Sequence, residues 1–221
     1  MKEILAIVPV RKGSQRVKNK NVRPFADTTL LEIKLKTLLQ VDRIDIRIDT
    51  DCPKAIEIAN QYGVQVHHRD VYYASSKCTN SEFFHHIAET TPEQYKYLMY
   101  VPVTSPLVKV ETINNVIDEF YKTNNYDSVN TTSLVKHHMW LDGKPLNYDP
   151  ENSPNSELLP KIHSLNYAVN ILPRDLMIKR RNIVGYKPQF IILNSYEGVD
   201  IDYWFDFQVA EFFYKLQNNI L

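Results

Sequence analysis

The segment from Arg11 to Arg23 gathers groups that could hold a phosphate chain. It contains six basic residues and no acidic residue, whereas Lys+Arg and Asp+Glu each total 26 in the whole chain. Gly13 and Ser14 allow backbone N–H groups to approach a ligand closely, and Arg11 offers a planar fork for phosphate oxygens. This pattern suggests polyphosphate binding with neutralisation of a leaving pyrophosphate. The alternative is a solvated run of charges without a ligand.

A pair of carboxylates near the C-terminus could hold a metal ion. In the stretch GVDID, alternate residues of an extended segment point the same way, so Asp200 and Asp202 would face one spot if Val199 and Ile201 face the core. Two carboxylates this close repel unless a cation or proton lies between them. Mg²⁺ (or Mn²⁺) suits such oxygen ligands and would polarise a phosphate. The alternative makes Asp202 the N-cap of a following helix, with Asp206 in its first turn.

Strand-like and helix-like segments alternate along the chain. The expected strands cover 3–10, 44–48, 64–66, 95–103, 127–135, 165–172 and 189–193. The expected helices cover 29–40, 52–63, 81–89, 110–123, 174–182 and 203–217. This order predicts a Rossmann-like α/β fold with three layers and a mainly parallel sheet, in a single domain over 1–221. Ligands of open α/β sheets bind beyond the carboxyl ends of the strands, which is where the basic segment would lie.

The alternation is interrupted over residues 136–160, which are rich in Asn, Pro, His and Asp. The dipeptide Asp142-Gly143 predicts the turn of a β-hairpin there. We expect a small β-excursion from the domain, serving as a flap or for dimerisation.

Composition excludes several classes of protein. The zero net charge gives no indication of nucleic acid or a membrane surface as partner. Cys52 and Cys78 are the only cysteines and form no CxxC, which argues against a disulfide framework or a cysteine zinc site. No apolar run approaches the roughly 20 residues of a membrane span, and the N-terminal run is too short for a secretion signal. A soluble cytoplasmic protein is expected.

Five motifs resemble, in order, those of the acylneuraminate cytidylyltransferases, or CMP-sialic acid synthetases. They are AIVPVRKGSQRVKNKN at 6–21, IDTD at 48–51, TSPL at 104–107, LPKIHSLNYAVNIL at 159–172 and VDIDYWFDFQVAE at 199–211. The resemblance covers nearly the whole chain. It implies a nucleotidyltransferase fold, CMP transfer from CTP to a hydroxyl of a sialic-acid-like sugar acid with release of pyrophosphate, and a role in surface polysaccharide synthesis. It also implies Mg²⁺ and a homodimer.

The resemblance also assigns roles to residues. The catalytic residues it implies are Arg11, Lys20 and Asp202, and the metal ligands are Asp200 and Asp202. The nucleotide site it implies comprises Arg11, Gly13, Ser14, Lys20, Asn21, Arg69, Thr104 and Ser105. Asn21 would support the basic loop or meet the base, and Arg69 would reach the cytosine or ribose unless it is a surface arginine. Asn166 would touch the acceptor.

The chain departs from the family pattern mainly on the acceptor side. The family's Arg-x-Asn-Gly is replaced by Ser164-Leu165-Asn166-Tyr167, a polar Gln before TSPL by Pro102-Val103, and a basic residue of the loop by Gln15. These changes favour an acceptor other than ordinary sialic acid, either another nonulosonic acid or a smaller acid, although a less active homologue would show them too. The alternative functions are a 3-deoxy-manno-octulosonate cytidylyltransferase and a non-catalytic nucleotide-binding sensor.

Other side chains carry weaker indications. The adjacent histidine pairs at 67–68, 85–86 and 137–138 lack metal-ligand spacing, so structural or exposed roles are favoured. His137, His138 and His163 remain candidates for the acceptor pocket. The predicted C-terminal helix carries aromatic residues on several of its sides. Burial of these side chains in the core and against a partner subunit is a better explanation of this pattern than base stacking.

Overall fold

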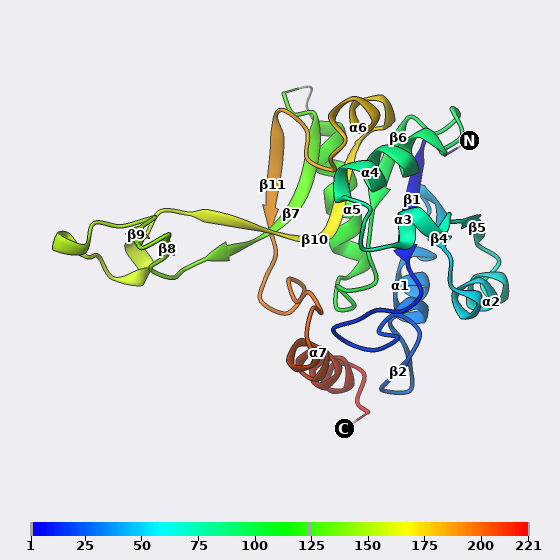
Figure 1. The fold of residues 1–221 in the computed structure, drawn as a ribbon, viewed down its shortest axis with the longest axis horizontal. Helices are drawn as coiled ribbons and strands as arrows, with labels where there is room; N and C mark the ends of the chain where they lie inside the picture. Colours follow the sequence, from blue (N-terminus) through cyan, green and yellow to red (C-terminus); the bar gives the residue numbers. More distant parts are fainter. Residues whose placement is uncertain (1, 123–124, 221) are drawn as a thin grey trace.

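The computed structural model describes residues 2–122 and 125–220, and its core is a seven-stranded sheet of order β11-β7-β10-β6-β1-β4-β5 (Figure 1). The strands are β1 (Ile4–Val10), β4 (Ile44–Thr50), β5 (Gln65–His68), β6 (Tyr97–Tyr100), β7 (Ser128–Val135), β10 (Ile162–Pro173) and β11 (Pro188–Ile192). All neighbouring pairs run parallel except those of β10, which is antiparallel to both β6 and β7. The predicted α/β fold with a mainly parallel sheet is confirmed.

Helices cover both faces of this sheet. They are α1 (Leu30–Leu38), α2 (Pro53–Gln61), α3 (Val71–Ala74), α4 (Asn80–Glu89), α5 (Val110–Lys122), α6 (Arg174–Arg180) and α7 (Trp204–Gln217). Alternate residues of β1 enter two separate cores: Ala6 and Val8 pack with α1, α2, α5 and α7, whereas Leu5 and Ile7 pack with α4 and α6. This division produces the three layers that the sequence predicted. Thr123, at the end of one predicted helix, lies outside the described residues.

Local sequence explains where several elements begin and end. Pro53 occupies the first turn of α2, where its missing N–H costs nothing, and Gly63 follows the helix with a φ of 66°. Thr79 and Glu82 form a reciprocal capping box that starts α4. The two short strands β2 (Pro24–Phe25) and β3 (Thr28–Thr29) pair with each other in a small separate hairpin, between the basic segment 11–23 and α1.

Residues 136–160 leave the sheet as an arm between β7 and β10 (Figure 1). Its tip pairs β8 (Trp140–Leu141) with β9 (Lys144–Pro145), and the turn residues Asp142 and Gly143 have φ values of 49° and 75°. The predicted hairpin is therefore confirmed. Two 3₁₀ turns, Pro150–Asn152 and Ser156–Leu158, complete the arm. None of the helices in the described part of the chain has the length and apolar character that crossing a bilayer requires.

Candidate active site

A cleft of about 530 Å³ opens beyond the carboxyl ends of β1, β5 and β6. Eight residues that the sequence singled out line it: Arg11, Ser14, Lys20, Asn21, Arg69, Thr104, Asp200 and Asp202. Four others do not, namely Gly13, Ser105, Asn166 and His163. The sequence reasoning missed the aromatic part of the lining, which includes Tyr73, Phe83, Tyr100 and Tyr167. They belong to α3, α4, β6 and β10. Tyr167 lies in the motif at 159–172, but no motif connected it with the other three or indicated that its side chain lines a cleft.

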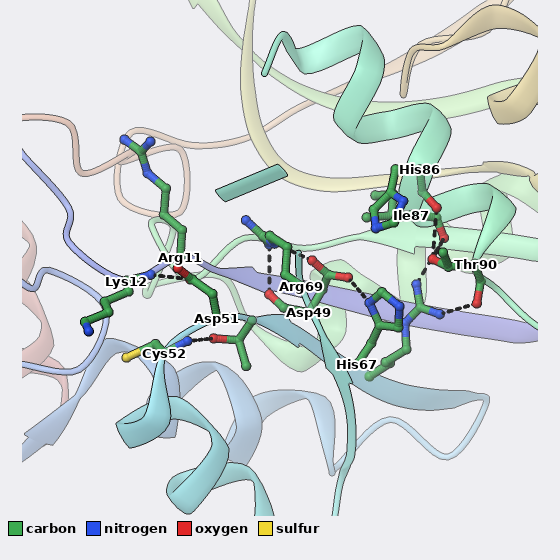
Figure 2. Close-up of polar contacts among 12 residues, drawn as sticks. Arg11, Lys12, Asp49, Asp51, Cys52, His67, Arg69, His86, Ile87 and Thr90 are labelled. Carbon is green, nitrogen blue, oxygen red and sulfur yellow. Dashed lines mark hydrogen bonds and ion pairs between the residues drawn. The ribbon is translucent and has the colours of Figure 1, made fainter. Parts of the chain in front are cut away.

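The basic loop, residues 11–23, is closed on itself and tied to the neighbouring strand. The Lys12 backbone N–H donates to Asp51 Oδ1 at 2.6 Å, directly after β4, and Figure 2 shows the Arg11 side chain extending away from this contact. The Asn21 side-chain amide lies 3.5 Å from the Arg11 carbonyl, and the Asn21 carbonyl accepts from the Leu31 N–H at 3.1 Å. Asn21 thus supports the loop. Asp51, the last residue of the IDTD motif, anchors the start of the loop to the end of β4.

The loop and the C-terminal aspartates meet across the cleft. Arg16 Nη2 lies 2.6 Å from Asp202 Oδ1, and the buried Lys20 ammonium donates to the Ile201 carbonyl. The Ile201 N–H in turn donates to the Thr104 carbonyl at 2.9 Å, so the TSPL segment joins the same cluster. Burial lowers the pKa of Lys20, and the charges of Asp202 and Asp200 oppose that change. The basic loop and the two aspartates, which are nearly two hundred residues apart in sequence, therefore line the same cleft.

The two carboxylates fit a divalent cation. Ile201 is fully buried and Val199 packs against the core, so Asp200 and Asp202 share the cleft side as the alternation predicted. Asp200 Oδ1 is buried and has no hydrogen-bond partner in the described part of the structure. Burial raises the pKa of Asp200; the Thr104 hydroxyl and Lys20 oppose this rise, whereas the Asp202 charge adds to it. A cation would satisfy this oxygen and relieve the repulsion.

Two further observations concern the candidate metal site and the residues beside it. Among residues 2–122 and 125–220, no cluster of three or more His, Cys, Asp or Glu side chains has metal-binding geometry, so substrate phosphates would have to complete the coordination. The alternative role of Asp202 as helix N-cap is wrong, because Tyr203 occupies the N-cap of α7. Asp206 does lie in the first turn, and its carboxylate accepts from the N–H groups of Asp202 at 3.0 Å and Tyr203 at 2.7 Å.

Arg69 is a buried part of the cleft wall rather than a surface arginine. Figure 2 shows its guanidinium held by Asp49: Arg69 Nε lies 2.5 Å from Asp49 Oδ1, and Nη2 donates to the Asp49 carbonyl at 2.8 Å. The other carboxylate oxygen lies 2.6 Å from His67 Nδ1, and Phe83 stacks under the guanidinium at 4.3 Å. Asp49 is fully buried. Its burial acts to raise its pKa, but His67 and Arg69 lower it overall.

The two residues expected to meet the acceptor have other partners. Asn166 is buried; its Oδ1 accepts from the Thr131 hydroxyl at 2.8 Å and its Nδ2 donates to Ser133 Oγ at 3.1 Å. His163 contacts the Thr132 hydroxyl at 2.9 Å and stacks on Phe190. Both side chains are thus engaged within the β7–β10–β11 part of the sheet, and their assignment to the acceptor has no support from their positions.

Lys34 is a buried cation under the cleft that the helical pattern did not reveal. It is 1% exposed on α1, and its ammonium donates to the carbonyl of Ser105 at 2.9 Å. Burial lowers its pKa from 10.5 to about 7, with partial opposition from the negative charge of Asp200. Lys34 therefore braces the segment that carries Thr104 and Ser105 from behind.

We expect the Lys34→Met variant to lose a pH dependence of stability that the wild type has. Between pH 7 and 9 an unfolded lysine keeps its proton, whereas folded Lys34 releases it, so wild-type stability should rise by about 2 kcal/mol relative to the variant. The free-energy cost of burying the charged Lys34 ammonium is fully present below its folded pKa and disappears above the pKa of an unfolded lysine. Urea unfolding at both pH values measures this. Lys36→Met, at an exposed lysine of α1, should keep the wild-type slope; equal slopes in all three proteins would contradict the prediction.

Comparison with known proteins agrees with this geometry. The family model described as cytidylyltransferase matches residues 5–165. The "Post-translational flagellin modification protein B" of Campylobacter coli is 25% identical, over 99% of this chain and 97% of its own length. The CMP-N,N'-diacetyllegionaminic acid synthase of Legionella pneumophila is also 25% identical, over 99% of each chain. A solved CMP:2-keto-3-deoxy-manno-octonic acid synthetase in complex with CTP shares the fold, with a TM-score of 0.72 at 10% identity over 98% of this chain and 100% of its own. The resemblance seen in the motifs is confirmed, and the chain belongs to the cytidylyltransferase family of nucleotidyltransferases.

Proposed function

We propose that this enzyme transfers CMP from CTP to a hydroxyl of a sialic-acid-like, nonulosonic sugar acid in the cytoplasm, for surface polysaccharide synthesis. The observation that carries the proposal is the convergence of the basic loop, the TSPL segment and the two aspartates around one cleft. The names of the relatives support the acceptor class, because one of them makes CMP-N,N'-diacetyllegionaminic acid.

The residues of the cleft suggest how the reaction proceeds. Arg11 and Lys20 would bind the phosphate chain and neutralise the charge that grows on pyrophosphate as it leaves. Asp200 and Asp202 would hold Mg²⁺ or Mn²⁺, which when bound polarises the α-phosphate. The acceptor hydroxyl loses its proton to the solvent and its oxygen forms a bond to the α-phosphorus. The bond from that phosphorus to the oxygen bridging it to the β-phosphate breaks in line, and pyrophosphate leaves with that oxygen. Positioning and charge neutralisation supply most of the rate.

The test is pyrophosphate release from CTP and Mg²⁺ with a panel of sugar acids, using UTP as the matched nucleotide control. Release with one or more nonulosonic acids, and CMP-sugar in the products, is the expected result. Release with 3-deoxy-manno-octulosonate alone would replace the proposed acceptor by that of the alternative enzyme. CTP binding without release for any acid would contradict the transfer and favour a nucleotide sensor.

We further propose a homodimer formed through the arm. Trp140 is 56% exposed and Leu158 75% exposed, and α7 presents Phe205 at 73%. Apolar side chains that gather on one part of the surface mark sites that a partner covers, and the arm also exposes Leu141 and Leu146. Light scattering with size-exclusion chromatography should report twice the chain mass of 25.9 kDa, and Leu158→Asp should shift the protein to monomer. A monomeric wild type at micromolar concentration would contradict this assembly.

A further inference from the structure

The backbone at Tyr167 adopts a conformation that a bulky residue rarely accepts. Its φ is 57°, in the left-handed region that glycine and asparagine favour. The residue lies inside the long strand β10, at the place where regular pairing with β7 is interrupted between Leu165 and Asn170. Strained residues of this kind persist when their surroundings enforce them, and they concentrate at functional sites.

Buried polar groups enforce this bulge from both sides. Before it, Asn166 Oδ1 accepts from the Ala168 N–H at 3.2 Å, in addition to the Thr131 hydroxyl. After it, Asn170 Nδ2 donates to the Tyr167 carbonyl at 2.9 Å, and Asn170 Oδ1 accepts from Asn130 at 3.0 Å. Both asparagines are almost completely buried. The bulge is therefore a built feature of the strand.

The bulge places the Tyr167 side chain in the cleft wall. Six residues other than glycine have positive φ in the described part of the chain, and Tyr167 is the one among them that lines the cleft. Tyr100 on β6 lines the same wall. The segment leading to Asp200 also packs here, since a Cβ on Gly198 would lie 2.7 Å from Ser133 Oγ and 3.6 Å from Asn166 Nδ2. Tyr167 and the proposed metal ligands Asp200 and Asp202 therefore line the same cleft.

The strand order divides the cleft into two ends. The basic loop follows β1, at the middle of the order β10-β6-β1-β4-β5. Arg69 follows β5 on one side of it, and Tyr167 belongs to β10 on the other. If the phosphate chain lies at the basic loop and the nucleoside towards Arg69, the end that contains Tyr167 is left for the acceptor.

We propose that Tyr167 contacts the sugar-acid acceptor and determines which acids are used, an inference that rests on the proposed function. The phenol can donate to or accept from an acceptor hydroxyl or carboxylate, and its ring offers an apolar face to the carbon skeleton of a sugar. The side chain also sets how much room this end of the cleft has. The strained backbone is thus the means by which a large side chain enters the wall at this position.

The test compares Tyr167→Phe, Tyr167→Asn and Tyr167→Gly with the wild type, measuring KM and kcat for CTP and for each acid of the panel. Tyr167→Phe should lower acceptor kcat/KM about tenfold through the lost hydrogen bond and leave the KM for CTP within about twofold. Tyr167→Asn and Tyr167→Gly accept the same φ and enlarge the site, so the rank order of acids should change in favour of bulkier ones.

Arg181→Gly is the matched control, because Arg181 has a φ of 55° at the end of α6 and does not line the cleft. It should relieve the same backbone strain, measured as a rise in melting temperature, with unchanged kinetics. An unaltered acid ranking and acceptor KM in all three Tyr167 variants would overturn the proposal, as would an equal rise in the KM for CTP and acceptor. A wild type that releases no pyrophosphate with any acid would instead overturn the proposed function itself.

Discussion

Replacing Asp202 with asparagine is expected to lower kcat for pyrophosphate release by about a hundredfold or more, with little loss of stability. The variant keeps the size of the side chain but removes one of the two negative charges proposed to hold the metal beside the α-phosphate. The midpoint of a Mg²⁺ titration of activity should move to higher concentration for the same reason. The ion pair with Arg16 is lost as well, but both side chains are about half exposed, so this costs at most about 1 kcal/mol.

Asp118→Asn provides the matched control for that measurement. Asp118 forms an exposed ion pair with Arg43 at 2.5 Å, and it does not line the cleft. Its replacement removes a comparable surface pair and should leave both kcat and the Mg²⁺ midpoint unchanged. Normal turnover and an unchanged midpoint in Asp202→Asn would rule out the assignment of this carboxylate to the metal.

The second large effect is expected at Asp49, where the Asp49→Ala variant should lose about 3–5 kcal/mol of unfolding free energy. The carboxylate is fully buried between Arg69 and His67, and its removal leaves a guanidinium inside the protein without its counter-charge. The midpoint of urea unfolding measures this loss. Glu3→Ala, which breaks the exposed pair of Glu3 with Lys96, should cost less than about 1 kcal/mol.

The same variant should change the acid response of the protein. Because the folded pKa of Asp49 is lowered, its stabilising contribution is present above the unfolded value of 3.8 and is lost as pH falls through the folded pKa. Asp49→Ala should therefore have a flatter stability curve than the wild type in that acidic range. Should the two curves run parallel down to acid unfolding, the carboxylate would not be the charged anchor of Arg69 that the contacts indicate.

Several features could be predicted because they depend on neighbours in sequence. Apolar runs and the glycine-bearing basic segment located β1 and the loop that follows it. Strict alternation placed Ile201 in the core and both aspartates in the cleft. Asp142-Gly143 formed the expected turn of the arm. In each case the backbone preference or the side-chain period is a property of a few consecutive residues.

Other features depend on contacts between distant segments and could not be predicted in this way. Lys34 interrupts an apolar helical stripe, and only the approach of Ser105 shows where its ammonium is satisfied. Asp49 and His67 come together because β4 and β5 pair in register at those residues.

The acceptor side of the cleft shows most clearly the difference between features that neighbouring residues determine and features that depend on contacts between distant segments. By itself, the sequence determined the strand that carries Asn166 and Tyr167 and the departure of that strand from the family pattern. It did not determine which of the two side chains reaches the cleft. From Leu165 to Asn170 the strand β10 advances five residues while β7 advances two, and an odd number of extra residues reverses the direction of the side chains beside it. The tertiary structure turns Asn166 into the sheet, where Thr131 and Ser133 bind it, and places Tyr167 in the cleft wall. The physical reason is that a bulge is stabilised by hydrogen bonds to a neighbouring strand, and these exist only after the strands have paired.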